Sequence, residues 1–188
     1  MNSQTQSITS KNGRSRVNFA WSGDRFSHTI DRRNEEGAWE TILRSVEGTP
    51  DDSWPPSPPF QEVESHVVGN GLTCLLAVGR AGSSHWSASV EEIQDDLRSE
   101  DETRFRFDVA CRLKSSESIL GSTYELNQSL SQENSSDTIY KDTQGKRIEL
   151  TSDAIVTDNA KSLAVRPQST HDTKPATARW VYDFLITS

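Results

Sequence analysis

A strict two-residue alternation runs through residues 104–113 and decides the class of fold. Apolar side chains occupy every second position, and mostly charged side chains occupy the positions between them. Successive side chains of a β-strand point to opposite faces, so the pattern predicts a half-buried strand. The side chains predicted to face the core are Phe105, Phe107, Val109, Cys111 and Leu113.

The same alternation recurs along the chain. It appears in residues 17–22 and 25–30, with Ser22-Gly23-Asp24 as a turn between them, and again in residues 178–186. Turn residues separate about eight to ten such runs, and no alternation of strands with long helices is visible. We therefore predict an all-β fold, a mainly antiparallel β-sandwich or an irregular β-barrel with at most one or two short helices. A short helix over residues 91–98 and one helical turn within residues 152–163 remain open.

The chain has 188 residues, a length typical of one domain. We predict a single β domain over residues 15–188, with a polar loop at residues 127–137. Residues 1–14 are polar and lack the apolar segment of a secretory signal, so we expect a disordered N-terminal arm.

Composition limits the classes of partner. The net charge is −8, which disfavours binding to nucleic acid or to an anionic membrane surface. No run of about 18 apolar residues is present, so no transmembrane helix is expected. Cys74 and Cys111 lie in apolar strand patterns and are predicted to be buried thiols in a reducing compartment, although a disulfide between neighbouring strands stays open. The expected location is the cytoplasm.

The segment 54–91 combines the features of a candidate site. Residues 72–78 are apolar on both faces, which predicts a central strand covered on both sides. A glycine turn follows, and Ser83, Ser84 and His85 come directly after it. Glycines let a backbone approach a ligand closely, so the turn can form a small pocket. The alternative is a plain hairpin in which Trp86 fills the core.

Arginines share the polar face of the strand 104–113. Arg106, Asp108 and Arg112 lie there together with Arg104. Guanidinium groups bind planar anions, so this face could hold a carboxylate or phosphate. The alternative is a solvated face with cross-strand ion pairs, and acidic residues opposite the arginines would distinguish the two interpretations.

A hydrolase is the alternative function. Its nucleophile would be Ser84 or Ser87, its base His85 or His28, and Asp108 would orient the base. The Gly-x-Ser-x-Gly elbow is absent, because Gly82 begins such a run without the second glycine. His28 lies between apolar neighbours, which is typical of a hydrogen-bonded core histidine. The four histidines show no metal-ligand spacing, so we predict no metal, no cofactor and no catalytic residue.

Residues 54–59 (WPPSPP) form a proline-rich segment. Proline fixes φ, so the segment must be extended. It could dock into a partner's groove as a polyproline II helix. Alternatively, it is a crossover whose ends are held to the core by Trp54 and Phe60.

Four segments together resemble a bacterial family of conserved hypothetical proteins without an assigned function. They are residues 45–59 (SVEGTPDDSWPPSPP), 81–91 (AGSSHWSASVE), 107–112 (FDVACR) and 120–124 (LGSTY). The resemblance implies no activity, cofactor or catalytic residue. It suggests that these segments belong to one structural unit.

These observations predict a non-catalytic ligand-binding or protein-interaction module. The expected partner is a small anionic ligand or another protein, and the sequence leaves the oligomeric state open. The predicted ligand-binding residues are Ser83, Ser84, His85, Arg106, Asp108 and Arg112.

Overall fold

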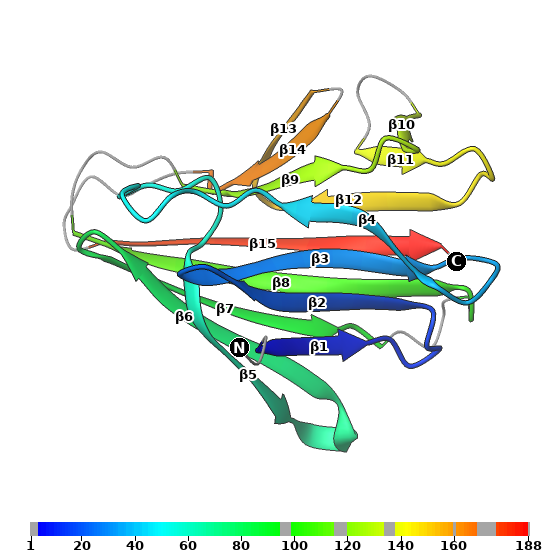
Figure 1. The fold of residues 1–188 in the computed structure, drawn as a ribbon, viewed down its shortest axis with the longest axis horizontal. Helices are drawn as coiled ribbons and strands as arrows, with labels where there is room; N and C mark the ends of the chain where they lie inside the picture. Colours follow the sequence, from blue (N-terminus) through cyan, green and yellow to red (C-terminus); the bar gives the residue numbers. More distant parts are fainter. Residues whose placement is uncertain are drawn as a thin grey trace.

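The computed structural model describes residues 4–94, 99–114, 120–133, 138–159, 161–168 and 176–187. Its strands form two antiparallel sheets that pack against each other as a β-sandwich (Figure 1). In spatial order, the seven-stranded sheet contains β1 (Thr5–Thr9), β2 (Ser15–Ser22), β3 (Arg25–Arg33), β4 (Trp39–Ser45), β9 (Ser122–Leu126), β14 (Ser162–Arg166) and β13 (Ile155–Asn159). The eight-stranded sheet contains β10 (Ser131–Gln132), β11 (Ile139–Lys141), β12 (Arg147–Ser152), β15 (Ala176–Thr187), β8 (Glu102–Leu113), β7 (Ser84–Glu92), β6 (Thr73–Ala81) and β5 (Phe60–Val67).

The all-β prediction is confirmed, and the arrangement is the sandwich. The two sheets hold more strands than the about eight to ten expected, because short strands such as β10 carry no readable alternation. A 3₁₀ turn, η1 (Gly69–Gly71), joins β5 to β6. Within the described ranges no helix is long and apolar enough to cross a membrane.

The long strands β8 and β15 lie side by side inside the eight-stranded sheet and pair along their whole length. The predicted alternation of β8 is confirmed, because every apolar side chain of the set from Phe105 to Leu113 is buried. On β15 the inward side chains are aromatic in part, and Tyr182 stacks on Phe107 with ring centroids 5.1 Å apart. Large aromatic surfaces supply much of the core of a chain that is only 32% hydrophobic.

The N-terminal residues differ from the expected disordered arm. Residues 5–9 form β1, which pairs with β2 at the edge of the seven-stranded sheet. Only Ile8 is an apolar anchor, and it is buried. The polar composition of the segment fits an edge strand, whose backbone pairing does not depend on apolar side chains.

The prediction that residues 72–78 are covered on both faces is wrong. These residues lie in and next to β6, which is the second strand from the sheet edge. Leu75 and Ala77 face the core, whereas Leu76 is 44% and Val78 is 46% exposed on the outer face. No second layer covers that face in the described structure, so the apolar run is half exposed.

Three other local predictions have different outcomes. The described part of residues 152–163, which leaves out residue 160, holds no helical turn and includes the hairpin strands β13 and β14. β7 extends to Glu92, and the rest of the possible helix at residues 91–98 lies largely outside the described residues. The predicted polar loop includes β10, and residues 134–137 lie outside the described residues.

The proline-rich segment 54–59 crosses from β4 in one sheet to β5 in the other. Trp54 meets Trp86 at its start, with ring centroids 6.0 Å apart, and Phe60 is buried at its end. Ser57 Oγ donates a hydrogen bond to the Thr123 carbonyl at 3.0 Å, which attaches the middle of the segment to β9. The crossover interpretation is therefore confirmed.

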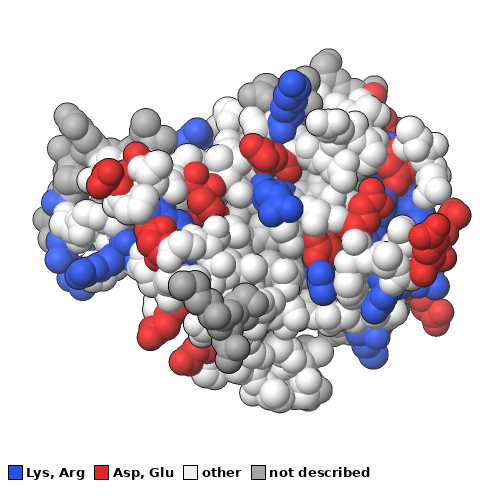
Figure 2. All heavy atoms as spheres, viewed as in Figure 1, with Lys and Arg blue, Asp and Glu red and all other residues white. Residues whose placement is uncertain are grey.

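Charged side chains are dispersed over the surface. Figure 2 shows acidic and basic residues interspersed on one face, without a large region of a single sign. Charge on this face therefore acts through individual side chains rather than through a broad field.

Candidate functional site

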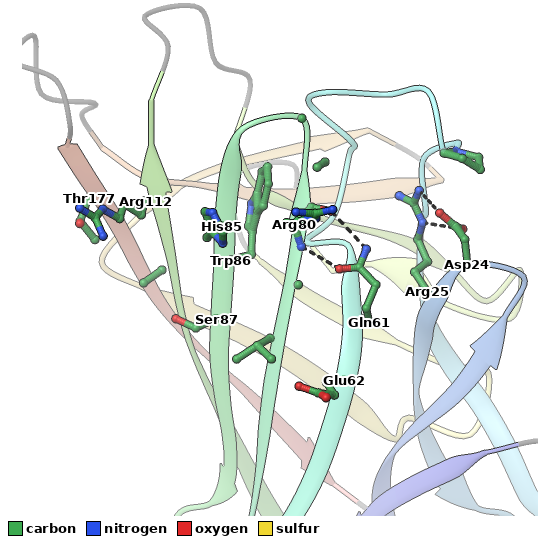
Figure 3. A pocket seen from close by; sticks show the side chains of 16 residues that line it. Asp24, Arg25, Gln61, Glu62, Arg80, His85, Trp86, Ser87, Arg112 and Thr177 are labelled. Carbon is green, nitrogen blue, oxygen red and sulfur yellow. Dashed lines mark hydrogen bonds and ion pairs between the residues drawn. The ribbon is translucent and has the colours of Figure 1, made fainter.

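A hollow of about 930 Å³ opens on the outer face of the eight-stranded sheet, near the turn between β6 and β7. Its polar wall is a row of side chains on four neighbouring strands. The register places Arg80 opposite His85, His85 opposite Arg112, and Arg112 opposite Thr177. Figure 3 shows these four residues in line across β6, β7, β8 and β15. We call Arg80, His85 and Arg112 the basic row.

The floor of the hollow consists of small side chains. Val78, Ser87 and Ala110 face outward one step further along the same strands, and they line the hollow. Residues two apart on a strand share one face, so long side chains of the basic row stand directly beside short ones. This difference in side-chain length creates the depression.

The basic row has no acidic partner in the part of the chain that the structure describes. Arg80, His85 and Arg112 are exposed, and no ion pair or side-chain hydrogen bond involves their charged or imidazole groups there. Unpaired guanidinium groups present their fixed set of donors to solvent, where an anion can bind them.

A second wall comes from the turn between β2 and β3. The Arg25 side chain is only 4% exposed, and its Nε and Nη2 donate to the Asp24 carboxylate at 3.0 and 2.8 Å. Nη2 also donates to the Thr49 carbonyl at 2.9 Å. The hydrogen bond from Arg25 lowers the pKa of Asp24. This ion pair between a buried arginine and a partly exposed aspartate closes one end of the hollow, with Pro50 beside it.

Gln61 and Gly79 fix the backbone under Arg80. The Gln61 side chain accepts from the Arg80 N–H at 2.8 Å and donates to the Arg80 carbonyl at 3.1 Å (Figure 3). A Cβ on Gly79 would lie 1.9 Å from the Pro59 carbonyl oxygen. Gly79 is therefore required by the close approach of the proline-rich segment rather than by a ligand.

The predicted residues Ser83, Ser84 and His85 do not form one cluster. Ser84 is 1% exposed and faces the core, because its neighbour His85 faces outward on the same strand. Ser83 is exposed in the turn. Of the three, His85 lines the hollow.

The pairing of Ser84 with His85 and Asp108 considered for a hydrolase is not assembled. Ser84 and His85 point to opposite faces, so they cannot exchange a proton directly. Asp108 lies four residues from Arg112 on β8, which puts it about 13 Å from the position opposite His85. Its carboxylate instead accepts from Arg179 Nε at 2.7 Å.

Arg106 is also engaged in an ion pair. Its Nε and Nη2 donate to the two oxygens of Asp183 at 2.8 and 2.9 Å, and Arg104 lies 3.2 Å from the same carboxylate. The hydrogen bonds that Arg106 donates to Asp183 raise the pKa of Arg106. Arg106 and Asp183 line a second hollow of about 750 Å³, together with further acidic residues and Arg179, so carboxylates outnumber basic groups there. Of the arginines predicted on β8, Arg112 is the one that lines the first hollow.

His28 is a core residue, as its sequence context predicts. Its Nε2 lies 2.9 Å from the Tyr124 hydroxyl, which lies 2.7 Å from the Tyr182 hydroxyl. Burial lowers the pKa of His28 to about 3, so the imidazole is neutral. Burial raises the pKa of both tyrosines. The network is enclosed between the sheets and does not reach the hollow.

Glu47 is a buried carboxylate that sequence reasoning missed. Ser45 Oγ donates to its Oε1 at 2.6 Å, and its Oε2 is buried without a partner among the described residues. Burial raises the pKa of Glu47 to about 7. It follows β4 in a segment with no alternation, so no pattern indicated its burial.

Sequence reasoning also missed Arg80, Gln61 and Arg25. Arg80 could have been found from the turn at Gly82, because a tight hairpin pairs the residues on either side of its turn. Arg25 comes from a distant segment, and Gln61, although it lies within residues 54–91, carried no local signal. Among the residues with assigned positions, no group of three or more His, Cys, Asp or Glu is arranged to hold a metal ion.

Comparison of the chain with protein-family models, curated proteins and solved structures finds no match. The resemblance of residues 45–59 and the other three segments to a bacterial family stays a prediction.

Proposed function

We propose that this chain is a non-catalytic binding module that holds the carboxylate or phosphate group of a small ligand on the basic row. The observation that carries the proposal is the line of Arg80, His85 and Arg112 beside a floor of small side chains. On the same sheet face, Arg106 and Arg104 already share an acidic partner. The basic row is where a ligand anion would meet donors without displacing a protein carboxylate.

The expected affinity is modest because the row is exposed. An exposed ion pair contributes about 0.2–1 kcal/mol, and hydrogen bonds to a charged group contribute about 1.5–3 kcal/mol. Two guanidinium contacts and one imidazole contact give about 4 kcal/mol, which corresponds to a Kd of about 1 mM for a bare anion. Contacts of the rest of the ligand with the hollow would add to this value.

Titration calorimetry with inorganic phosphate and with succinate tests the proposal. We expect saturable binding of at least one anion, weakened at least about tenfold in the double variant His85→Gln/Arg112→Gln. The matched control is Arg44→Gln, which removes an exposed arginine from β4 on the other sheet. The proposal fails when neither anion binds at about 50 mM, or when the control weakens binding as much as the double variant.

We also propose a cytoplasmic location and no nucleic-acid partner. Cys74 and Cys111 are free, buried thiols, which is the usual state of cysteines in a reducing compartment. The net charge of −8 disfavours a phosphate backbone as partner. A thiol titration of freshly purified, denatured protein tests the first point, because two reactive thiols per chain are expected.

A further inference from the structure

Of the two carboxylates that line the hollow, Asp24 is paired with Arg25, and the other, Glu62, lies at the opposite end from Arg112. Glu62 lies on β5, faces outward and lines the hollow. Within the described ranges no basic side chain forms an ion pair with it. The register places Glu62 opposite Val78, so it continues the line of the floor residues Val78, Ser87 and Ala110.

The two ends of the hollow therefore carry opposite charges. Glu62 on β5 and Arg112 on β8 are separated by three strand spacings and a two-residue step along the strands, or about 16 Å between backbone positions, a span that the two long side chains can shorten. Figure 3 shows Glu62 below Gln61 on one side and Arg112 on the other, with His85 and Arg80 between them. A ligand that pairs with both ends must carry a cation and an anion about this far apart.

We infer, on the basis of the proposed anion site, that the ligand is a zwitterion of the length of a short unblocked peptide. An extended chain advances about 3.4 Å per residue, so three or four residues place a terminal ammonium and a terminal carboxylate about 10–14 Å apart. The carboxylate binds Arg112 and His85, and the ammonium binds Glu62. The side chains lie over the floor of the hollow, where Val78 and Ala110 offer apolar contact.

Arg80 has a separate role in this arrangement. It stands between the two ends, and its backbone is held on both sides by Gln61. Its guanidinium group lies next to the path of the peptide and donates to peptide carbonyl groups. With Glu62 included, the hollow selects for peptides of a certain length that have both termini free. The basic row alone selects only for a negatively charged group.

Calorimetry with tetra-alanine and its blocked forms tests this inference. We expect tetra-alanine to bind at least about fivefold more tightly than its N-acetyl form, and more tightly than di-alanine. Glu62→Gln is expected to weaken binding of free tetra-alanine about fivefold and to leave the N-acetyl peptide unchanged. The matched control is Glu64→Gln, because Glu64 lies two residues along the same face of β5 but does not line the hollow.

The outcomes separate this inference from the proposed function. If free and N-acetylated tetra-alanine bind with equal affinity, or if Glu62→Gln does not change the affinity for free tetra-alanine, the ligand is not a zwitterion held by Glu62. Either result is still compatible with the proposed anion site. Equal binding of di-alanine and tetra-alanine also overturns the inference, because the length argument then fails. Binding that C-terminal amidation does not weaken overturns the anion site together with the inference.

Discussion

Replacing Gly79 by alanine is expected to destabilise the protein, because the proline-rich segment leaves no space for a side chain at that position. The new Cβ would lie 1.9 Å from the Pro59 carbonyl oxygen, 2.8 Å from its carbonyl carbon and 2.9 Å from Gln61 Oε1. Real Cβ atoms do not approach backbone this closely, so the proline-rich segment must move by about 1 Å. Two prolines restrict that movement, because Pro58 and Pro59 have fixed φ.

The expected loss is about 2–4 kcal/mol in the free energy of unfolding, within the range of overpacking substitutions. For a chain of this length that corresponds to a fall in Tm of about 5–15 °C. Urea unfolding followed by tryptophan fluorescence measures the loss, because Trp54 and Trp86 pack next to the altered contact.

Gly69→Ala is the matched control, since a Cβ on Gly69 would have no other atom within 4 Å and the φ of this residue is not positive. We expect a change within about 0.5 kcal/mol for this variant. Equal stability of the two variants would refute the packing of the proline-rich segment on β6.

Three further predictions concern the buried and paired polar groups. Tyr124→Phe removes the hydroxyl between His28 and Tyr182 and should cost about 2–3 kcal/mol in urea unfolding; a neutral change contradicts the network. Between about pH 4.5 and 6.5, Glu47 is protonated only in the folded state, because its pKa is raised from 4.5 to about 7, so it makes the free energy of unfolding fall as the pH rises. His28 is protonated only in the unfolded state, because its pKa is lowered from 6.5 to about 3, so it makes the free energy of unfolding rise with pH. The two slopes, each about 1.4 kcal/mol per pH unit, nearly cancel in this window. Unfolding curves of Glu47→Gln should therefore lose about 2–3 kcal/mol as the pH falls through that window, and a flat profile would count against a buried neutral His28. Asp183→Asn removes the partner of Arg104 and Arg106 and should cost about 1 kcal/mol in urea unfolding; unchanged stability contradicts the ion pairs.

The fold follows from the sequence where side chains alternate strictly. Residues 104–113 alternate between buried and partly or fully exposed side chains, because β15 pairs with the whole strand and β7 with most of it. The prediction that residues 72–78 are covered on both faces was wrong, because an apolar sequence shows which residues prefer burial but not whether a second layer exists to bury them. β1 was missed because backbone pairing to β2 holds a polar segment in place.

The candidate site was predicted in part. His85 and Arg112 were expected at a shared site, and the register of β7 and β8 places them opposite each other. Arg106 and Asp108 were also expected there, but Asp183 and Arg179 on β15 bind them. That pairing depends on which strand lies beside β8, and β15 is more than sixty positions later in the chain. Local patterns do not carry such information.

The most direct test of the account follows backbone amide chemical shifts during titration of the protein with tetra-alanine. The anion site predicts saturable shifts at Arg80, His85 and Arg112, with little change at Arg106 and Asp183 in the second hollow. Shifts that grow without saturation, or that are as large at the ion-paired residues as at the basic row, would contradict the account.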